Sequence, residues 1–201
     1  KKVRSKILFD IGSIFKVDKK KILQVAAAVE CIHAYSLIHD DLPCMDNDNL
    51  RRGKLTTHKK FSESTAILAG NSLLTIAFQI LSEESLNLDN HKKIELINLL
   101  SESSGHTGIA GGQFLDLSYE KIKKTKKQII DMQIKKTGKL FSFCCVAPII
   151  MSGKTKYRNK FNKIGNEIGL LFQIADDLID LRGKTSNAGK KTKKDLKMGK
   201  A

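Results

Sequence analysis

Long apolar stretches with the spacing of helices dominate the sequence. Residues 19–41 contain neither Pro nor Gly, and apolar residues recur along them at intervals of three and four. This period places them on one face of a helix, which consists of Ile22, Val25, Val29, Ile32 and Ser36, with Leu37 at its edge. Because the other faces are also largely apolar, we expect this helix at the centre of a bundle.

Four further stretches carry the same pattern, at residues 62–82, 90–106, 126–153 and 157–183. Ser62 is placed to cap the first of them, with Glu63 in its first turn. The Gly-rich segment 108–117 lets backbones approach closely, and the Gly- and Lys-rich segment 184–201 is expected to be a mobile loop. Few helix breakers are present, since the 201 residues include two Pro, so the pattern predicts an all-α fold in a single helical bundle.

The composition indicates one globular domain over residues 1–201, because 41% of the residues are hydrophobic and the length suits one core. The formal net charge is +15. Three causes remain open: a nucleic-acid surface, an anionic small substrate drawn in by positive potential, and a compositional bias toward Lys, Ile and Asn. The Lys residues are scattered with few aromatic residues among them, so no stacking platform is visible and we expect no nucleic-acid partner.

Cysteine usage indicates reduced thiols and therefore a cytoplasmic protein. The four Cys form no C-x-x-C pair, and Cys144 and Cys145 are adjacent in an apolar run. No run of eighteen apolar residues is present, so we expect no membrane span. The sequence begins with Lys rather than Met and stops in the middle of a pattern, so we expect that both true ends are missing and that targeting cannot be judged.

Acidic residues gather at the ends of two predicted apolar helices. In "DDLID", Asp176 and Asp180 are four residues apart and share a helical face, where like charges destabilise a helix by about 0.3 kcal/mol. A solvated acidic face is the simplest interpretation of this cluster alone. The apolar segment before it, "IGLLFQIA", argues instead that these carboxylates emerge from the core.

The other cluster lies in "HDDLPCMDNDNLRRG". Asp40 and Asp46 come close only if the chain bends, which Pro43 favours because it disfavours helical geometry in the preceding residue. Carboxylates without Cys or His partners suit a hard cation such as Mg²⁺, which commonly joins them to substrate phosphates. Arg51 and Arg52 follow, and guanidinium groups match phosphate oxygens. The cluster therefore indicates a metal–diphosphate site.

Two other kinds of metal site share some of these residues. The segment from Asp46 resembles the start of a calcium-binding loop, but Arg51 stands where that loop needs Gly and Thr57 where it needs Glu, which excludes it. His33 together with "HDD" could instead belong to an all-helical metal phosphohydrolase built from His and Asp. That enzyme class is kept as the runner-up.

A resemblance to a known family runs along almost the whole chain. The segment "VECIHAYSLIHDDLPCMDNDNLRRG" resembles the family's first Asp-rich motif, and "FQIADDLIDLRG" resembles its second. The segments "GGQFLDL", "KKTGKLF" and "GKKTKKDLKMGKA" also resemble its motifs, in family order. The family is that of the trans-isoprenyl diphosphate synthases, and the resemblance is greatest to its bacterial-type farnesyl diphosphate synthases.

This resemblance implies an all-α bundle around a deep central cavity, as a homodimer, from which this sequence lacks N- and C-terminal flanking helices. It implies Mg²⁺-dependent head-to-tail condensation of isopentenyl diphosphate with an allylic diphosphate, dimethylallyl or geranyl, to give farnesyl diphosphate and pyrophosphate. Two or three Mg²⁺ ions are expected to bridge the carboxylates and the diphosphate. The bulky ring of Tyr35, five residues before Asp40, and the family's insertion of Pro43 and Cys44 in the first motif together favour a short product, farnesyl first and geranyl next.

The resemblance also implies roles for single residues. The Mg²⁺ ligands are expected to be Asp40, Asp46 and Asp176, helped directly or through water by Asp41, Asp177 and Asp180. The allylic diphosphate is expected to contact Arg51, Lys136, Lys190 and Lys200, and the allylic cation to face Thr137 and Gln173. The isopentenyl diphosphate pocket is expected to contain Lys1, Arg4, His33 and Arg52. The floor of the allylic pocket is expected to include Gln113 and Asp116, and chain growth to be limited by Tyr35.

Several of these residues have simpler explanations when taken alone. His33 on an apolar helix would be a core histidine, Gln173 a core polar group, and Lys190 and Lys200 solvated charges. The two Asp clusters and the Arg pair do not depend on the resemblance.

The sequence departs from the family pattern at Ser5 and Leu55, where Pro is usual, and at Lys193, where Gly is usual. None of these is a metal carboxylate. Three other functions can be separated from prenyl transfer. A class I terpene cyclase normally lacks the second Asp-rich motif, a non-catalytic subunit would lose one of the two, and a nucleic-acid-binding module would show steep salt dependence.

Overall fold

Helices account for most of the residues that the computed structural model describes, which are residues 2–120 and 122–182, with side chains as far as residue 179. The longer helices are α1 (Val3–Ile14), α2 (Lys19–Asp40), α4 (Glu63–Ser82), α5 (Asn90–Ser104), α6 (Ile109–Ser118), α7 (Lys126–Gln133), α8 (Lys139–Ser152) and α9 (Arg158–Arg182). The shorter elements are α3 (Thr57–Lys60), the 3₁₀ turns η1 (Glu84–Leu86) and η3 (Thr155–Tyr157), the π-helical turn η2 (Ile134–Gly138), and the antiparallel strands β1 (Leu50–Arg51) and β2 (Lys54–Leu55). The predicted all-α class is confirmed, and the described residues also include one short hairpin, β1–β2.

Most predicted helices form close to their predicted bounds. The Ser62 hydroxyl accepts the backbone N–H of Thr65 at 3.0 Å and so caps α4 as predicted. The predicted helix 126–153 is continuous but contains the π-helical turn η2. α6 is helical where only a close approach of backbones was expected. α1 was not predicted at all, because only Leu8 and Gly12 of its residues are buried and its apolar period is weak.

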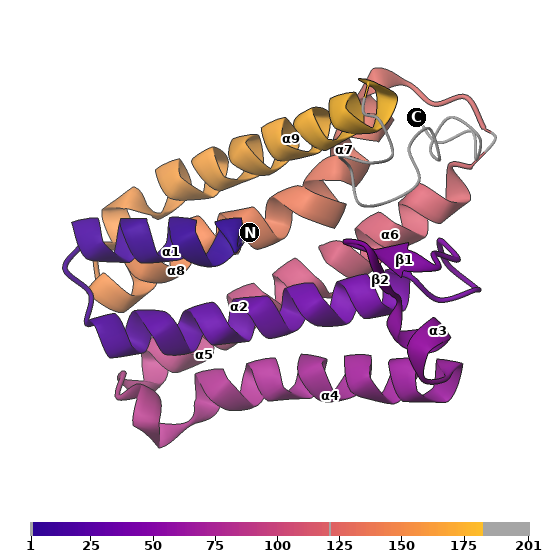
Figure 1. Ribbon diagram of the computed structural model, residues 1–201. Coiled ribbons are helices and arrows are strands. Elements are labelled where there is room, and N and C mark those ends of the chain that lie inside the picture. The colour runs from indigo at the N-terminus through magenta and orange to yellow at the C-terminus, as the bar shows by residue number, and fades with distance from the viewer. Residues whose placement is uncertain (1, 121, 183–201) are drawn as a thin grey trace.

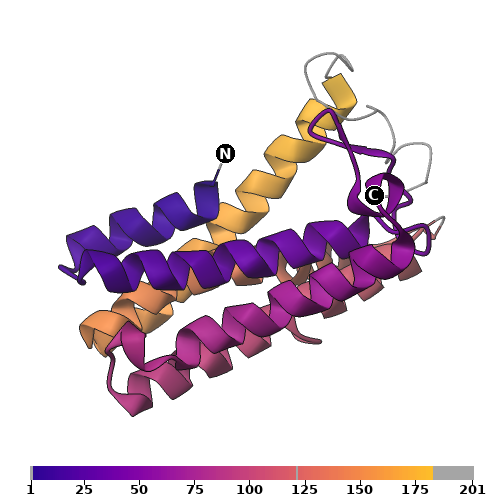
Figure 2. The ribbon, with the colours of Figure 1, turned by 60° about the horizontal axis from the view of Figure 1, so that its bottom comes forward.

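The central position predicted for α2 is confirmed. α4 packs along one side of α2, α1 and α8 pack along the other, and α9 lies along α8 (Figure 1). In both views the C-terminal ends of α2 and α9 lie at the same end of the bundle (Figure 1 and Figure 2). The two acidic helix ends, which are far apart in the sequence, are therefore brought to one end of the molecule.

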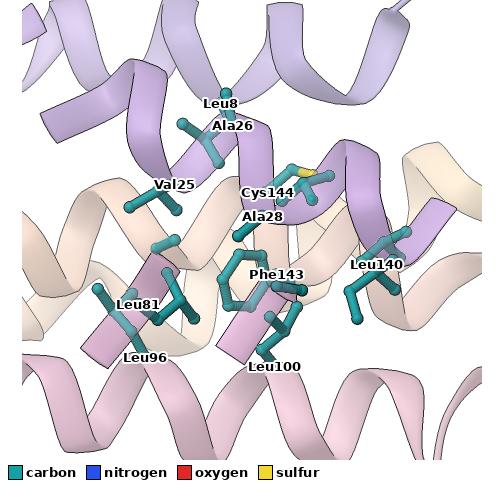
Figure 3. Packing of buried hydrophobic residues seen from close by; sticks show 14 of the residues in the cluster. Leu8, Val25, Ala26, Ala28, Leu81, Leu96, Leu100, Leu140, Phe143 and Cys144 are labelled. Carbon is teal, nitrogen blue, oxygen red and sulfur yellow. The ribbon is translucent and has the colours of Figure 1, made fainter. Parts of the chain in front are cut away.

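The hydrophobic core lies between α1, α2, α5 and α8 and receives Leu81 from α4 (Figure 3). Leu8, Val25, Leu100 and Phe143 come from four different helices, and each is fully buried. Full burial of such a side chain contributes about 1.5–3 kcal/mol. The predicted core face of α2 is confirmed, because every residue on it is buried, namely Ile22, Val25, Val29, Ile32 and Ser36. This core holds the helix that carries the first Asp cluster.

Two helices, α2 and α4, are long and apolar enough to cross a membrane by length and composition. α2 meets this test because it is the core helix. α4 has only 22% of its apolar window buried, so it presents apolar side chains such as Leu68 on its outer surface. The buried share of the apolar window is 39% in α2, and one or two such helices are weak evidence for a membrane span, while the outer face of α4 needs another explanation.

The four cysteines all lie in the described part of the chain and are free thiols, as predicted. Cys144 and Cys145 are buried in α8, whereas Cys44 is exposed. The prediction of packed thiols thus holds for the adjacent pair and is wrong for Cys44, because the turn that follows α2 projects into solvent.

Candidate active site

The chain turns back on itself directly after α2, as the position of Pro43 predicts. The backbone N–H of Asp46 donates to the carbonyl of Asp40 at 2.9 Å, and that of Asp48 donates to the carbonyl of Asp41 at 3.2 Å. Two successive carboxylate-bearing segments are thereby placed side by side. A straight helix would have separated Asp40 and Asp46 by more than one turn.

Asp40 is partly buried among charged side chains. Burial raises the pKa of its carboxyl group to about 6, Lys136 opposes this rise, and Asp46 adds to it. Asp40, Asp46 and Lys136 therefore lie within electrostatic range of one another. Neighbouring buried carboxylates repel each other, and a cation placed between them relieves that repulsion.

The hairpin β1–β2 separates the two arginines that follow the turn. Arg52 and Gly53 form its tip with φ values of +54° and +78°, which is the left-handed pair that a two-residue hairpin loop requires. Arg52 is exposed at this tip. Arg51 precedes it on β1 and points back toward α2, so the hairpin directs the two guanidinium groups differently.

Two nitrogens of the Arg51 guanidinium group, Nε and Nη2, donate hydrogen bonds to the carboxylate of Asp41. Its Nε lies 2.8 Å from Oδ1 and 2.9 Å from Oδ2 of Asp41, and its Nη2 also donates to Oδ1. Asp48 lies beside the same Nη2 at 3.7 Å. The sequence placed Asp41 near Mg²⁺ and Arg51 on a diphosphate, whereas the structure pairs the two with each other. Among the described side chains, the hydrogen bonds of Arg51 involve Nε and Nη2, which leaves Nη1 for another anion.

The π-helical turn η2 carries Lys136 and Thr137 toward the acidic end of the bundle. The Nζ of Lys136 lies 2.6 Å from Oδ2 of Asp116 on α6. Burial acts to lower the pKa of Lys136, but Asp116, Asp40 and Asp46 outweigh it, and the pKa lies above its usual value. This approach requires Gly112, because a Cβ there would lie 2.2 Å from the backbone nitrogen of Lys136.

Thr137 is linked to the second Asp cluster through Gln173. The hydroxyl of Thr137 donates to Oε1 of Gln173 at 3.1 Å, and Nε2 of Gln173 donates to Oδ1 of Asp177 at 2.8 Å. The close packing of α9 on η2 depends on Gly169, since a Cβ there would lie 2.5 Å from the Cα of Gly138. The structure therefore brings the "KTG" and "FQIADD" motifs into direct contact.

The other predicted residues of the second cluster lie on or beyond α9. Asp176 lies beside Asp177 on this helix and is partly buried. Asp180 also belongs to α9, but its side chain lies outside the described part of the chain. Lys1, Lys190 and Lys200 lie outside the described residues altogether, so their predicted roles stay predictions.

Arg4 and His33 meet between α1 and α2. The Nη1 of Arg4 lies 3.4 Å from Nε2 of His33. The pKa of His33 is lowered to about 3 by burial and by the positive charges of Arg4, Arg52 and Arg51. The imidazole is therefore neutral near pH 7, and its Nε2 accepts from the guanidinium. Three of the predicted pocket residues, Arg4, His33 and Arg52, are thus within electrostatic reach of one another.

Gln113 and Tyr35 both occupy buried positions. The amide nitrogen and oxygen of Gln113 are buried without a hydrogen-bond partner among the described residues, which is expensive unless a ligand completes them. The ring of Tyr35 stands edge-on to His39 with centroids 5.6 Å apart, and its hydroxyl lies 3.5 Å from the carbonyl of Ser104. These positions agree with the predicted pocket floor, and the roles themselves stay predictions.

Thr56 and His58 support the site and were not found from the sequence. The hydroxyl of Thr56 donates to the carbonyl of Asp48 at 2.7 Å and lies 3.2 Å from Nδ1 of His58. Both residues are buried, so they hold the end of the acidic turn. The segment "LTTHKK" is polar and aperiodic, and no signal in it predicts burial.

The donor set at this end of the bundle fits Mg²⁺. It consists of carboxylate oxygens, and Asp40 and Asp46 carry a repulsion that a cation would relieve. Among the described residues, no three His, Cys, Asp or Glu side chains are grouped closely enough to hold a metal ion by themselves. Mg²⁺ often takes only one or two carboxylates and completes its shell with water and substrate phosphates, so such an arrangement suits a metal that arrives with a diphosphate.

Comparison with known proteins agrees with this geometry. The farnesyl diphosphate synthase of Micrococcus luteus is 49% identical over 175 residues, which is 87% of this chain and 60% of that protein. An apo FPP/GFPP synthase structure from Zymomonas mobilis superposes with a TM-score of 0.86 at 45% identity and covers 96% of this chain and 68% of that one. A Helicobacter pylori geranyltransferase complexed with magnesium and isoprenyl diphosphate gives a TM-score of 0.90 at 36% identity over 100% of this chain and 68% of that one.

The chain thus spans about 60% of the length of the curated relative from Micrococcus luteus. A family model described as polyprenyl synthetase matches residues 1–201. The predicted family is confirmed over the whole sequence, and the chain belongs to the polyprenyl synthetase family.

Proposed function

We propose that the protein is a Mg²⁺-dependent prenyltransferase that joins isopentenyl diphosphate to dimethylallyl or geranyl diphosphate and gives farnesyl diphosphate and pyrophosphate. The observation that carries this proposal is the contact of Thr137 with Gln173 and of Gln173 with Asp177. This contact joins a cationic turn, which faces the first Asp cluster, to the second Asp cluster. Two acidic clusters and a lysine at one end of an apolar bundle suit an anionic group attached to a hydrocarbon tail.

The allylic diphosphate is expected to bind at the end of the bundle where Asp40 of α2 and Lys136 of η2 lie within electrostatic range of each other. Lys136 and the Nη1 of Arg51 would contact its oxygens, with Lys190 and Lys200 as further cations. Asp40, Asp46 and Asp176 would hold Mg²⁺, with Asp41, Asp177 and Asp180 in support. Bound Mg²⁺ would draw negative charge from the diphosphate and so favour its departure.

Thr137 and Gln173 are placed to stabilise the positive charge that the allylic carbon gains as its C–O bond breaks. Thr137 directs its hydroxyl hydrogen to Gln173, so the remaining lone pairs of its oxygen face elsewhere. Gln173 is in turn oriented by Asp177. Preorganised dipoles of this kind stabilise developing charge at no cost in reorganisation. The alkene of isopentenyl diphosphate then forms the new C–C bond, and the proton that it loses goes to the released pyrophosphate.

Arg4, His33, Arg52 and Lys1 are proposed to hold the diphosphate of isopentenyl diphosphate. Arg4 and Arg52 lower the pKa of His33, so this pocket is positive without a protonated histidine. Tyr35 is proposed to limit the length of the product. The ring is buried in α2, one turn below Asp40, where a growing tail that extends into the bundle would meet it.

The apolar outer face of α4 is proposed to pair with a second copy of the chain. Leu68 is 66% exposed, and Phe61, Ile67 and Ile76 are exposed beside it. Large apolar surfaces of this kind usually mark contacts with another protein or a membrane. A homodimer would cover them, and the free thiols support a cytoplasmic location for it.

Incubation with isopentenyl diphosphate, dimethylallyl diphosphate and Mg²⁺, followed by chromatography of the products, tests the proposed function. Farnesyl diphosphate and pyrophosphate are expected, and EDTA is expected to abolish turnover. Release of inorganic phosphate without any prenyl product would favour the phosphohydrolase alternative. Steeply salt-dependent DNA binding without diphosphate chemistry would favour a nucleic-acid-binding module.

A further inference from the structure

Two aromatic rings hold the guanidinium group of Arg4. Its Cζ lies 4.6 Å from the ring centroid of Phe141 and 5.7 Å from that of Phe172. The two rings contact each other, with centroids 5.2 Å apart and planes inclined by 43°. Distances below about 6 Å place the cation in the attractive range of both π faces. Phe141 and Phe172 together form what we call the aromatic clamp of Arg4.

The clamp is assembled from three helices. Arg4 lies near the start of α1, Phe141 in the first turn of α8, and Phe172 on α9 beside Gln173. α1 packs on α8, and α8 packs on α9. The same packing that brings Gln173 to Thr137 therefore also brings Phe172 to Arg4, so the two halves of the proposed reaction site share one helix.

No carboxylate among the described residues lies within ion-pair distance of Arg4, although Glu30 is close enough to act to raise its pKa. None of the ion pairs among the described side chains includes Arg4, and its Nε is buried without a hydrogen-bond partner there. Its polar contact is with the neutral imidazole of His33. Arg4 is partly buried, and this burial lowers its pKa. A cation removed from water usually has a carboxylate in direct contact, so this arrangement calls for a function.

An aromatic clamp has two consequences that a carboxylate would not have. The guanidinium carbon lies over the faces of both rings, and a ring leaves the positive charge in place, so N–H groups of Arg4 other than the buried Nε can still bind a diphosphate. A carboxylate would instead occupy those N–H groups and cancel the charge that attracts the anion. Arg51, which Asp41 engages through Nε and Nη2, illustrates that alternative at the other diphosphate position.

We propose that Phe141 and Phe172 are positioning residues that hold the guanidinium group of Arg4, charged and open, for the diphosphate of isopentenyl diphosphate. This inference rests on the proposed function. It assigns to the two rings a role in the affinity for one of the two substrates, with no direct part in bond making. The allylic diphosphate is bound by other residues, so its KM is predicted not to depend on the clamp.

Steady-state kinetics of Phe172→Leu in the full chain, with each substrate varied in turn, tests the inference. We expect the KM for isopentenyl diphosphate to rise about fivefold to thirtyfold, the range that loss of a partly desolvated cation–π contact gives. The KM for the allylic diphosphate and kcat at saturation are expected to change less than about twofold. Phe172→Tyr keeps the π face and is expected to show the same KM for isopentenyl diphosphate as the unchanged protein.

Phe141→Leu and Phe143→Leu form a matched pair on α8. Phe141 and Phe143 are both fully buried, but Phe143 packs in the core with Leu100 and Leu140 (Figure 3). Both variants lose a buried ring, so both should lower the melting temperature. Only Phe141→Leu is expected to raise the KM for isopentenyl diphosphate.

Equal KM values in Phe172→Leu and in the unchanged protein would overturn the inference while leaving the proposed function intact. A similar KM rise in Phe143→Leu would also overturn it, because loss of packing would then explain the effect. Calorimetric titration with isopentenyl diphosphate distinguishes a failure of this inference from a failure of the proposed function. If the unchanged protein neither binds this substrate nor forms a prenyl product, the proposed function fails first.

Discussion

The ammonium group of Lys136 on the π-helical turn and the carboxylate of Asp116 on α6 form an ion pair of 2.6 Å, and both side chains are mostly shielded from water. This pair connects the "KTG" and "GGQ" motifs. Helix packing at Gly112 makes it possible. Lys136 consequently reaches the first Asp cluster in a fixed position.

Replacing Asp116 by Asn is expected to lower the free energy of unfolding by about 2 kcal/mol, because Lys136 would lose its nearest counter-charge in a buried position. Turnover should fall as well, since the ammonium group is no longer held. Chemical denaturation and steady-state assays measure the two effects. Asp131→Asn is the matched control, because it breaks the exposed pair of Asp131 with Lys135, which should cost less than about 0.5 kcal/mol. Equal losses in the two variants would argue against a special role for the buried pair.

Removal of one carboxylate from either Asp cluster is expected to reduce turnover by orders of magnitude. Asp40→Asn and Asp176→Asn each delete a proposed Mg²⁺ ligand while keeping the shape of the side chain. The fold should survive, and Asp40→Asn should be at least as stable as the unchanged protein because repulsion by Asp46 is relieved. Asp10→Asn on the exposed surface of α1 serves as the control. Full activity in either cluster variant would remove that residue from the metal site.

The length of the product should depend on the ring of Tyr35. Tyr35→Ala opens space below Asp40 and is expected to give products longer than farnesyl diphosphate, which chromatography of the dephosphorylated prenols detects. Tyr35→Phe keeps the ring and loses only the long contact of its hydroxyl with Ser104, so its products should be unchanged. If the Ala variant makes nothing longer than farnesyl, another residue forms the floor.

As the pH falls below 7, Asp40, whose pKa is raised to about 6 in the folded protein, is expected to add stability in the absence of substrate, whereas His33 is expected to remove it. Burial and nearby arginines hold its pKa at about 3 in the folded protein, against about 6.5 in the unfolded chain. The imidazole is therefore protonated in the unfolded state first, and this lowers the free energy of unfolding by about 2 kcal/mol between pH 7 and pH 5. His33→Gln should remove this part of the slope in denaturation measured across that range. An unchanged slope would show that the imidazole is accessible to protons in the folded state.

A charge placed on the outer face of α4 should dissociate the proposed dimer. Leu68→Glu is expected to halve the mass seen by light scattering, because burying an unpaired carboxylate at an apolar interface is unfavourable. Ile14→Glu introduces the same charge at an exposed apolar position of α1 and should leave the mass unchanged. A monomeric mass for the unchanged protein, with Leu68-dependent binding to lipid vesicles, would assign this face to a membrane instead.

Much of the fold was accessible from local patterns. The apolar period of α2, the cap at Ser62 and the bend near Pro43 each depend on residues close together in the chain, and all three predictions are confirmed. α1 escaped prediction because few of its residues are buried. The hairpin was also missed, since strands of two residues are too short for an alternating pattern to show.

The candidate site could be predicted from the sequence only in part, because the sequence shows local patterns and not the contacts between distant residues. The sequence identified its acidic and basic residues because their charge crowding has no simple structural purpose. Thr56 and His58 were missed, because buried polar residues in a polar loop carry no periodic signal. The pairing of Arg51 with Asp41 was missed as well, because a sequence does not show which carboxylate a given arginine will reach.

The sequence by itself determined most of the long helices, the central place of α2 and the two acidic helix ends, because these depend on residue type and local spacing. Only the tertiary structure decided which charges meet. Asp41 with Arg51, Lys136 with Asp116, and Arg4 over two neighbouring rings are contacts between different elements, set by how closely the backbones pack. Glycines such as Gly112 and Gly169 allow that approach, and the packing of whole helices, a sum over many buried contacts, then selects the partners.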